Sequence, residues 1–421
     1  MAKNSKQQST VSDAVIAGGG YVGLCVAVAI KTASPHLNIA LIDGAPEDAI
    51  QKEERASAIA AAASRMLDQL GIWQTLLKDA QPIKEMIVTD SRTADPIRPV
   101  FLTFGDVNAD MARNAEASSE PFAHMVPNRA MILALRERAT ALGVDMRHGE
   151  TVEGFDTGDI TTIVHLGSGD ELTTRLLIAA DGVRSRLRDH AGIKTVNWNY
   201  GQKGIVTTIG HERPHEGRAE EHFLPGGPFA TLPLSGNRSS LVWTEPDDVA
   251  DRLMAADDFT FELELEQRFG HKLGELEVLG PRRAFPLGLT LARSFVKPRL
   301  ALVGDAAHGI HPIAGQGLNL GFKDAAALAQ TIVEADRLGL DIGSMAVLER
   351  YERWRRFDTV QMGMVTDVLN RLFSNDIGPL RTLRTIGLGI VDRLPSIKEA
   401  FINQAAGRAA SNPSLLNGEA I

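Results

Sequence analysis

Residues 14–23 read Ala-Val-Ile-Ala-Gly-Gly-Gly-Tyr-Val-Gly, and an uncharged apolar run follows them. This order predicts a buried strand, a tight turn and a helix, with the G-x-G-x-x-G spacing at Gly18, Gly20 and Gly23. A second apolar run ends in Asp43, 20 residues after the last of these glycines. The whole pattern is typical of a βαβ unit in which the helix start binds a pyrophosphate and the acid binds an adenosine ribose.

The same apolar run, with Lys3 and Lys6 ahead of it, also has marks of an export signal. Three consecutive glycines argue against that, because the apolar core of an export signal is an uninterrupted helix. A membrane-spanning helix would need about 20 apolar residues. We therefore predict a cytoplasmic protein with a short disordered leader over residues 1–10.

Composition agrees with a globular protein of a reducing compartment. The 421 residues are 44% hydrophobic, carry a net charge of −9 and include one cysteine, Cys25. A single cysteine forms no internal disulfide, and its place in the predicted first helix indicates a small core residue rather than a nucleophile. The acidic balance argues against nucleic acid as a partner, and no Cys or His spacing predicts a metal site.

The rest of the pattern predicts an α/β protein whose nucleotide-binding part is interrupted by an antiparallel sheet. Residues 56–70 have a helical composition that ends at a glycine. Residues 161–166 and 171–179 flank Gly-Ser-Gly-Asp and predict a hairpin. Short alternating runs between residues 204 and 243 predict the antiparallel sheet.

Two later strand ends also carry an acid beside a glycine. Asp181-Gly182 follows the hairpin, and Gly304-Asp305 follows an apolar run. Residues 311–324 then read His-Pro-Ile-Ala-Gly-Gln-Gly-Leu-Asn-Leu-Gly-Phe-Lys-Asp, a loop whose glycines let main-chain N–H groups approach a ligand at a helix start. Three such sites, far apart in the sequence, predict a long dinucleotide such as FAD. A strand-to-helix turn with a capping Asp is the alternative at Asp181.

Together these motifs resemble the flavin-dependent aromatic hydroxylases, class A monooxygenases, and within them the UbiH-type group that hydroxylates ubiquinone precursors. The resemblance extends from residue 14 to about residue 407, and H-P-x-A-G-Q-G-x-N-x-G-x-x-D at 311–324 is its most specific part. It implies FAD bound by Gly18, Gly20, Gly23, Asp43, Arg55, Arg129, Asp181, Gly182, Gly304, Asp305, Gly315, Gln316, Gly317, Leu318 and Asn319. It also places His311 and Pro312 at the flavin edge. An imidazole bonded to a backbone carbonyl is the alternative for His311, and a solvated helix-terminal side chain is the alternative for Arg55.

The activity that the resemblance implies is hydroxylation of the aromatic ring of a polyprenylated phenol or quinone precursor. O2 and NAD(P)H would be consumed, and a C4a-hydroperoxyflavin would deliver the oxygen while the protein orients the ring and excludes water. No second G-x-G-x-x-G follows, so NAD(P)H would bind without a domain of its own. The alternatives are a prenyl reductase or halogenase of the same fold, or a non-catalytic flavoprotein that scaffolds a quinone-making assembly.

We expect a discontinuous Rossmann-like FAD-binding domain from residues 11–80, 126–188 and 285–360. Residues 81–125 and 189–284 would form the substrate domain, an inserted antiparallel β-sheet, and residues 361–421 a helical C-terminal region. Apolar residues recur in that region at helix-like intervals with arginines between them. Three interpretations are open for it: packing on the main domain, contact between copies in a homo-oligomer, or docking on the inner face of a membrane or on a quinone-biosynthesis complex.

Overall fold

The computed structural model describes residues 11–90, 100–105, 121–310, 316–373 and 412–421. Its first part, the parallel-sheet part, is built on an eight-stranded sheet whose main order is β18-β19-β11-β1-β2-β8. The core strands β19, β11, β1, β2 and β8 are mutually parallel, and β9 and β10 extend the sheet as a meander with β11. Their bounds are β1 Ser12–Ala17, β2 Ile39–Asp43, β8 Asp145–His148, β9 Val152–Thr157, β10 Thr162–Leu166, β11 Glu171–Ala179, β18 Val296–Lys297 and β19 Leu300–Leu302.

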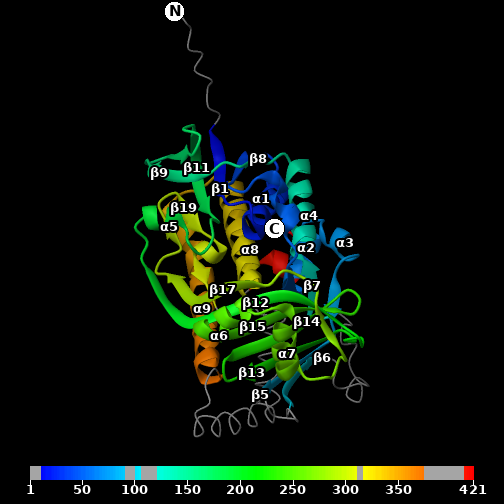
Figure 1. The fold of residues 1–421 in the computed structure, drawn as a ribbon. Coiled ribbons are helices and arrows are strands. Elements are labelled where there is room, and N and C mark those ends of the chain that lie inside the picture. Colours follow the sequence, from blue (N-terminus) through cyan, green and yellow to red (C-terminus); the bar gives the residue numbers. More distant parts are fainter. Residues whose placement is uncertain (1–10, 91–99, 106–120, 311–315, 374–411) are drawn as a thin grey trace, which may run out of the picture.

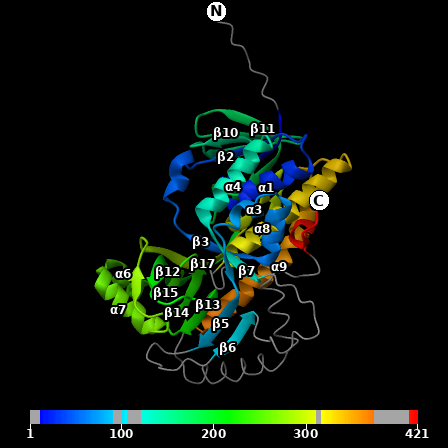
Figure 2. The same cartoon turned by 90° about the vertical axis from the view of Figure 1, so that its right-hand side faces the viewer.

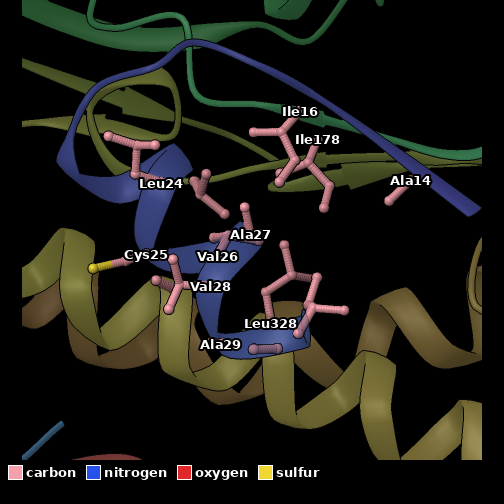
Figure 3. Close-up of a cluster of buried hydrophobic side chains, with 14 of the residues drawn as sticks. Ala14, Ile16, Leu24, Cys25, Val26, Ala27, Val28, Ala29, Ile178 and Leu328 are labelled. Atoms are coloured by element: carbon pink, nitrogen blue, oxygen red, sulfur yellow. The ribbon is translucent and has the colours of Figure 1, made fainter. Parts of the chain in front are cut away.

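Residues 23–31 of helix α1 (Tyr21–Ala33) are all buried, as expected for a helix segment with apolar side chains on nearly every face. The helix packs against β1 and β2 and also contacts α4 (Asn128–Ala141) and α8 (Gln316–Arg337). Figure 3 shows its Val26 and Ala27 beneath Ile16 and Ile178, with Leu328 of α8 on the other side. Cys25 is fully buried here, and burial raises the pKa of its thiol, which agrees with the predicted core role.

The second part, the antiparallel-sheet part, is a nine-stranded sheet in the order β20-β17-β12-β15-β14-β13-β5-β6, with β16 paired to β12. Its strand pairs are antiparallel except for β13 with β5, which are parallel. Figure 2 shows this sheet below the parallel-sheet part. Helices α6 (Asp247–Ala255) and α7 (Asp258–Phe269) cover one of its faces, around the fully buried Ile205, Phe229 and Trp243. The strand bounds are β5 Glu85–Asp90, β6 Val100–Gly105, β12 Thr195–His211, β13 Arg218–Leu224, β14 Gly227–Leu234, β15 Arg238–Pro246, β16 Leu276–Val278, β17 Arg283–Ala292 and β20 His308–Gly309.

Helix α9 (Met345–Phe373) contacts both parts, alongside α8 (Figure 1). Near its start, the Tyr351 hydroxyl donates to the carbonyl of Leu302 at the end of β19, at 2.8 Å. Near its end, the Trp198 indole donates to the Asp367 carboxylate at 3.0 Å. The helix therefore ties the parallel strands to the antiparallel sheet. None of the helices in the described ranges has a stretch long and apolar enough to span a membrane.

The predicted helix over residues 56–70 is wrong at its start. Residues Ala56–Ala60 form strand β3, which pairs with β7 (Ala123–Pro127) in a small sheet with β4 (Gln81–Ile83). Helix α2 begins only at Ala61 and runs Ala61–Gln69. Alanine favours helix locally, but pairing with β7 overrides that preference over residues 56–60.

Two elements also run across boundaries that the sequence suggested. Strand β17 pairs with β12 up to Ala292, so the antiparallel sheet continues past the expected division at residue 284. Helix α9 runs without a break through the expected division at residue 360. The remaining divisions stay predictions, and the leader and most of the C-terminal region lie outside the described ranges.

The last described residues return to the parallel-sheet part. The short helix η5 (Ser414–Asn417) buries Leu415 and Leu416 in the main core beside α2 and α8. The Arg65 guanidinium donates to the carbonyl of Leu416 at 3.1 Å, and the Gln330 amide oxygen accepts from the N–H of Ser414 at 3.0 Å. This segment is therefore an integral part of the core.

Candidate cofactor site

The first glycine turn is packed directly against the end of β11. Gly18 has a φ of 120°, and a Cβ on it would lie 2.2 Å from the carbonyl oxygen of Ala180. A Cβ on Gly23 would lie 2.0 Å from the carbonyl oxygen of Gly18. Both glycines are therefore required by close backbone packing, which joins the predicted glycine-rich turn to the segment that begins with Asp181.

The third turn, at Gly304, lies on the other side of the same helix start. Gly304 has a φ of 58°, and a Cβ on it would lie 3.1 Å from Cγ2 of Val22 in α1. A Cβ on Gly321 of α8 would lie 2.5 Å from the same methyl group. The structure thus gathers the ends of β1, β11 and β19 at one edge of the sheet, although their sequences are far apart. Carboxyl ends of parallel strands are where such folds bind nucleotides.

Gly20 differs from its two neighbours in the motif. It is the N-cap residue of α1 and has no side chain to cap the helix. Within the described residues, no heavy atom lies within 4 Å of the position that its Cβ would take. An open space at an uncapped helix start fits a pyrophosphate, because free N–H groups and the helix dipole both favour an anion there.

Asp181 and Asp305 supply oxygen acceptors at the other two turns. Oδ2 of Asp181 accepts from the N–H of Leu187 at 3.2 Å, whereas its buried Oδ1 has no hydrogen-bond partner among the described residues. Asp305 is open to solvent on one side, yet desolvation by the surrounding protein raises the pKa of its carboxyl, and the charge of Asp324 adds to the effect. Gly182, with a φ of 83°, lies beside open space. Acceptors of this kind fit the hydroxyl groups of a ribose or ribityl chain.

Asp43 lies next to the first turn, where the sequence placed it, but it already has protein partners. Its Oδ2 accepts from Nη2 of Arg136 at 3.0 Å, and its Oδ1 accepts from the N–H of Ala45 at 3.1 Å. Arg136 of α4 was missed because nothing in its local sequence distinguishes it from a surface arginine. Each carboxylate oxygen can accept a further bond, so the ribose contact of Asp43 stays a prediction.

Arg55 bridges the two parts of the molecule. Its guanidinium makes a bidentate pair with Glu53, at 2.8 Å from Nε to Oε1 and 2.5 Å from Nη2 to Oε2. The same group lies 5.5 Å from the centre of the Phe285 ring on β17, within cation–π range. Arg129, at the start of α4, is exposed. Arg55 is thus held by protein contacts while 39% of its side chain stays exposed, and its contact with FAD stays a prediction.

Asn319 contacts the protein backbone across the site. Its Oδ1 accepts from the N–H of Ala60 at 2.9 Å, and its Nδ2 donates to the carbonyl of Ala58 at 3.0 Å. Gly317 and Leu318 are half-buried in the first turn of α8, which starts at Gln316. His311, Pro312 and Gly315 lie outside the described residues, so both interpretations of His311 stay open.

Comparison with known proteins places this chain in a family. Residues 11–362 match the family model described as FAD binding domain. The chain is 43% identical to Ubiquinone hydroxylase UbiL of Rhodospirillum rubrum, over 96% of this chain and 91% of that protein. It is 31% identical to the 3-demethoxyubiquinol 3-hydroxylase of Escherichia coli, over 94% of this chain and 98% of that protein.

A solved structure shows the same fold. The p-nitrophenol 4-monooxygenase PnpA from Pseudomonas putida DLL-E4 matches with a TM-score of 0.76 at 19% identity, over 96% of this chain and 100% of that one. The fold and the family matches define an FAD-dependent aromatic hydroxylase. Within that class, the chain belongs to the UbiH/COQ6 family of flavin hydroxylases of ubiquinone biosynthesis.

Proposed function

We propose that this enzyme hydroxylates the aromatic ring of a polyprenylated phenol, with O2 as the oxygen source and NAD(P)H as the reductant. The names of its relatives support hydroxylation in ubiquinone biosynthesis. Two observations carry the proposal. The three glycine turns meet at one sheet edge, and a row of apolar side chains lies on the sheet face that is turned toward the parallel-sheet part.

FAD, when bound and reduced, would supply the oxygen chemistry. The chain's own residues would hold it. The start of α1 at Gly20 would bind the pyrophosphate, Asp43 would accept from the adenosine ribose, and Asp305 would accept from the ribityl hydroxyls. Asp181 and Gly182 would lie between these sites, where NAD(P)H would also approach.

The antiparallel sheet carries a short row of apolar side chains that would contact the ring and its prenyl tail. Val206 pairs with Val242, which in turn pairs with Ala230, so the three form a row across β12, β15 and β14. All three are half-buried, whereas their neighbours on the opposite face are fully buried under α6 and α7. Adjacent residues of a strand point to opposite faces, so this row lies on the face that α6 and α7 do not cover.

Arg55 identifies the direction in which this face points. Phe285 pairs with Gly204 on β12 and shares a face with Val206, two residues further on. Since the Arg55 guanidinium lies over the Phe285 ring, the face is turned toward the parallel-sheet part and its cofactor site. In this arrangement the protein would orient the ring and exclude water, and no protein nucleophile is required.

Isotope incorporation tests the proposal. Purified enzyme with FAD, NAD(P)H, a prenylated phenol and ¹⁸O2 should yield a product with one added ¹⁸O, measured by mass spectrometry. A gain of two hydrogens would indicate a prenyl reductase, and halogen incorporation in the presence of halide would indicate a halogenase. Unchanged phenol, with NAD(P)H oxidation equal to that without the phenol, would indicate a scaffold. Each of these three outcomes would contradict hydroxylation.

A further inference from the structure

The Asp324 carboxylate of α8 is completely buried behind the Gly304 turn. Its Oδ2 accepts from the N–H of Gly304 at 2.9 Å and from Nε2 of His308 at 2.5 Å. Its Oδ1 accepts from Nε of Arg355 on α9 at 2.8 Å. A fully buried carboxylate is tolerated only when it is paired and hydrogen-bonded in this way.

Asp324 belongs to a wider cluster of charged side chains on α8 and α9. Arg355 also donates to the Asp358 carboxylate at 2.7 Å, and Lys323 lies 3.4 Å from the same carboxylate. Asp324 and Asp358 thus face the basic side chains of Arg355 and Lys323 in a largely buried cluster. Burial would raise the pKa of Asp324, but His308 and Arg355 outweigh it and hold that pKa below its ordinary value. Asp324 is therefore a fixed negative charge.

A buried guanidinium, that of Arg188, holds the other side of the Gly304 turn. Nη1 of Arg188, which is 5% exposed, donates to the carbonyl of Ala306 at 3.1 Å and to that of Val183 at 3.0 Å. The residue before Asp305 is thus held by Asp324, and the residue after it by Arg188. Asp305 itself is left open on one side.

We infer that Asp324 and Arg188 are positioning residues that fix the backbone on both sides of Asp305, so that its carboxylate is aimed at the cofactor before the cofactor binds. Neither residue needs to touch FAD. The inference rests on the proposed contact of Asp305 with the ribityl chain. Charge-assisted hydrogen bonds to backbone groups give such a turn both strength and direction.

Release of FAD from the holoenzyme, followed by the rise of flavin fluorescence on dilution, tests this inference. Asp324→Asn keeps the shape of the side chain but turns an amide N–H toward one of its three donors, so one anchor is lost. FAD release should become at least about tenfold faster, and the visible spectrum of the bound flavin should shift. The control is Asp341→Asn, which weakens an ion pair with the buried Arg299, bonded at 2.6 Å, in the same part of the molecule. It should leave FAD release within about twofold of wild type even where thermal stability falls.

A second pair of variants tests the inference independently, in case Asp324→Asn does not fold. Arg188→Met removes the donor to Ala306 and should accelerate FAD release, whereas Arg188→Lys should restore part of the retention. A folded Asp324→Asn or Arg188→Met variant with wild-type FAD release would overturn the inference. So would equal acceleration by Asp341→Asn.

Asp305→Asn separates this inference from the function on which it rests. If Asp305→Asn accelerates FAD release and the two positioning variants do not, only the positioning role fails. If Asp305→Asn itself releases FAD at the wild-type rate, the proposed ribityl contact fails, and the positioning role fails with it.

Discussion

The carbonyl oxygen of Ala180 lies only 2.2 Å from the position that a Cβ on Gly18 would take. Gly18→Ala must therefore push β1 away from β11, and the φ of 120° adds backbone strain. We expect FAD-free protein to lose about 3 kcal/mol of stability, measured by urea unfolding.

Gly20→Ala should behave in the opposite way, because its Cβ meets open space and its φ is −76°. Stability without FAD should stay within about 0.5 kcal/mol of wild type, while FAD affinity falls about tenfold or more as the methyl group enters the pyrophosphate position. Equal effects of the two substitutions on FAD-free stability would contradict the assignment of Gly20 to the ligand.

Asn319→Ala should destabilise the protein even without FAD. The substitution leaves the N–H of Ala60 and the carbonyl of Ala58 without their side-chain partner, at about 1–3 kcal/mol for each buried group. Asn197→Ala, on an exposed side chain, is the matched control. Weaker FAD binding at unchanged stability would show instead that Asn319 acts on the cofactor.

Val242→Asp places a charge in the middle of the apolar row. We expect kcat/KM for a prenylated phenol to fall at least about tenfold, because desolvating the new carboxylate opposes binding of an apolar guest. FAD affinity should be unchanged. Ile163→Asp, at a 38% exposed site on the β10 hairpin strand, should leave both values unchanged. Equal loss in the two variants would count against a substrate role for the row.

Glu220 should make the protein sensitive to acid. Burial alone would raise its pKa, but hydrogen bonds from His222 and Lys272 outweigh it and lower the pKa to about 2, from an ordinary 4.5. The stabilisation is present above pH 4.5 and is lost as the pH falls toward 2. Wild type should therefore lose about 2–3 kcal/mol more than Glu220→Gln over this range. Glu137→Gln, on an exposed face of α4, should follow the wild-type curve.

Leu416→Ala should destabilise the parallel-sheet part, since the side chain is 1% exposed in its core. The expected loss is about 3 kcal/mol by urea unfolding. Leu338→Ala, at a 74% exposed leucine, should have almost no effect. A negligible loss at Leu416 would show that the packing of η5 contributes little.

The βαβ unit was predictable from local sequence, because its strand, glycines, helix and Asp43 all lie within residues 12–43. Strand β3 was not, because its conformation depends on β7 and on Asn319, which is 259 residues from Ala60. No pattern within residues 56–60 reports contacts at that distance.

The cofactor site shows the same limit. Glycine and acid motifs predicted the turns that the structure brings together, but not the buried ions that hold them. Asp324 did leave a signal: Lys323 and Asp324 interrupt the otherwise apolar residues 320–329, and such a charge pair has to find partners in the core. The sequence carries no such signal for Arg188. Arginines stand at positions 184, 186 and 188, and nothing in their pattern reveals which of them is buried.

The burial of Leu415 and Leu416 beside α2 and α8 also bears on how the enzyme is made. The core contains β1, which is synthesised first, and Leu415 and Leu416, which are synthesised some 400 residues later. On the ribosome, the nascent chain must therefore hold an incomplete nucleotide domain while the whole antiparallel sheet is synthesised. Such long-range closure is slow and leaves apolar surface uncovered, so this enzyme should depend on chaperones during translation more than its size alone suggests.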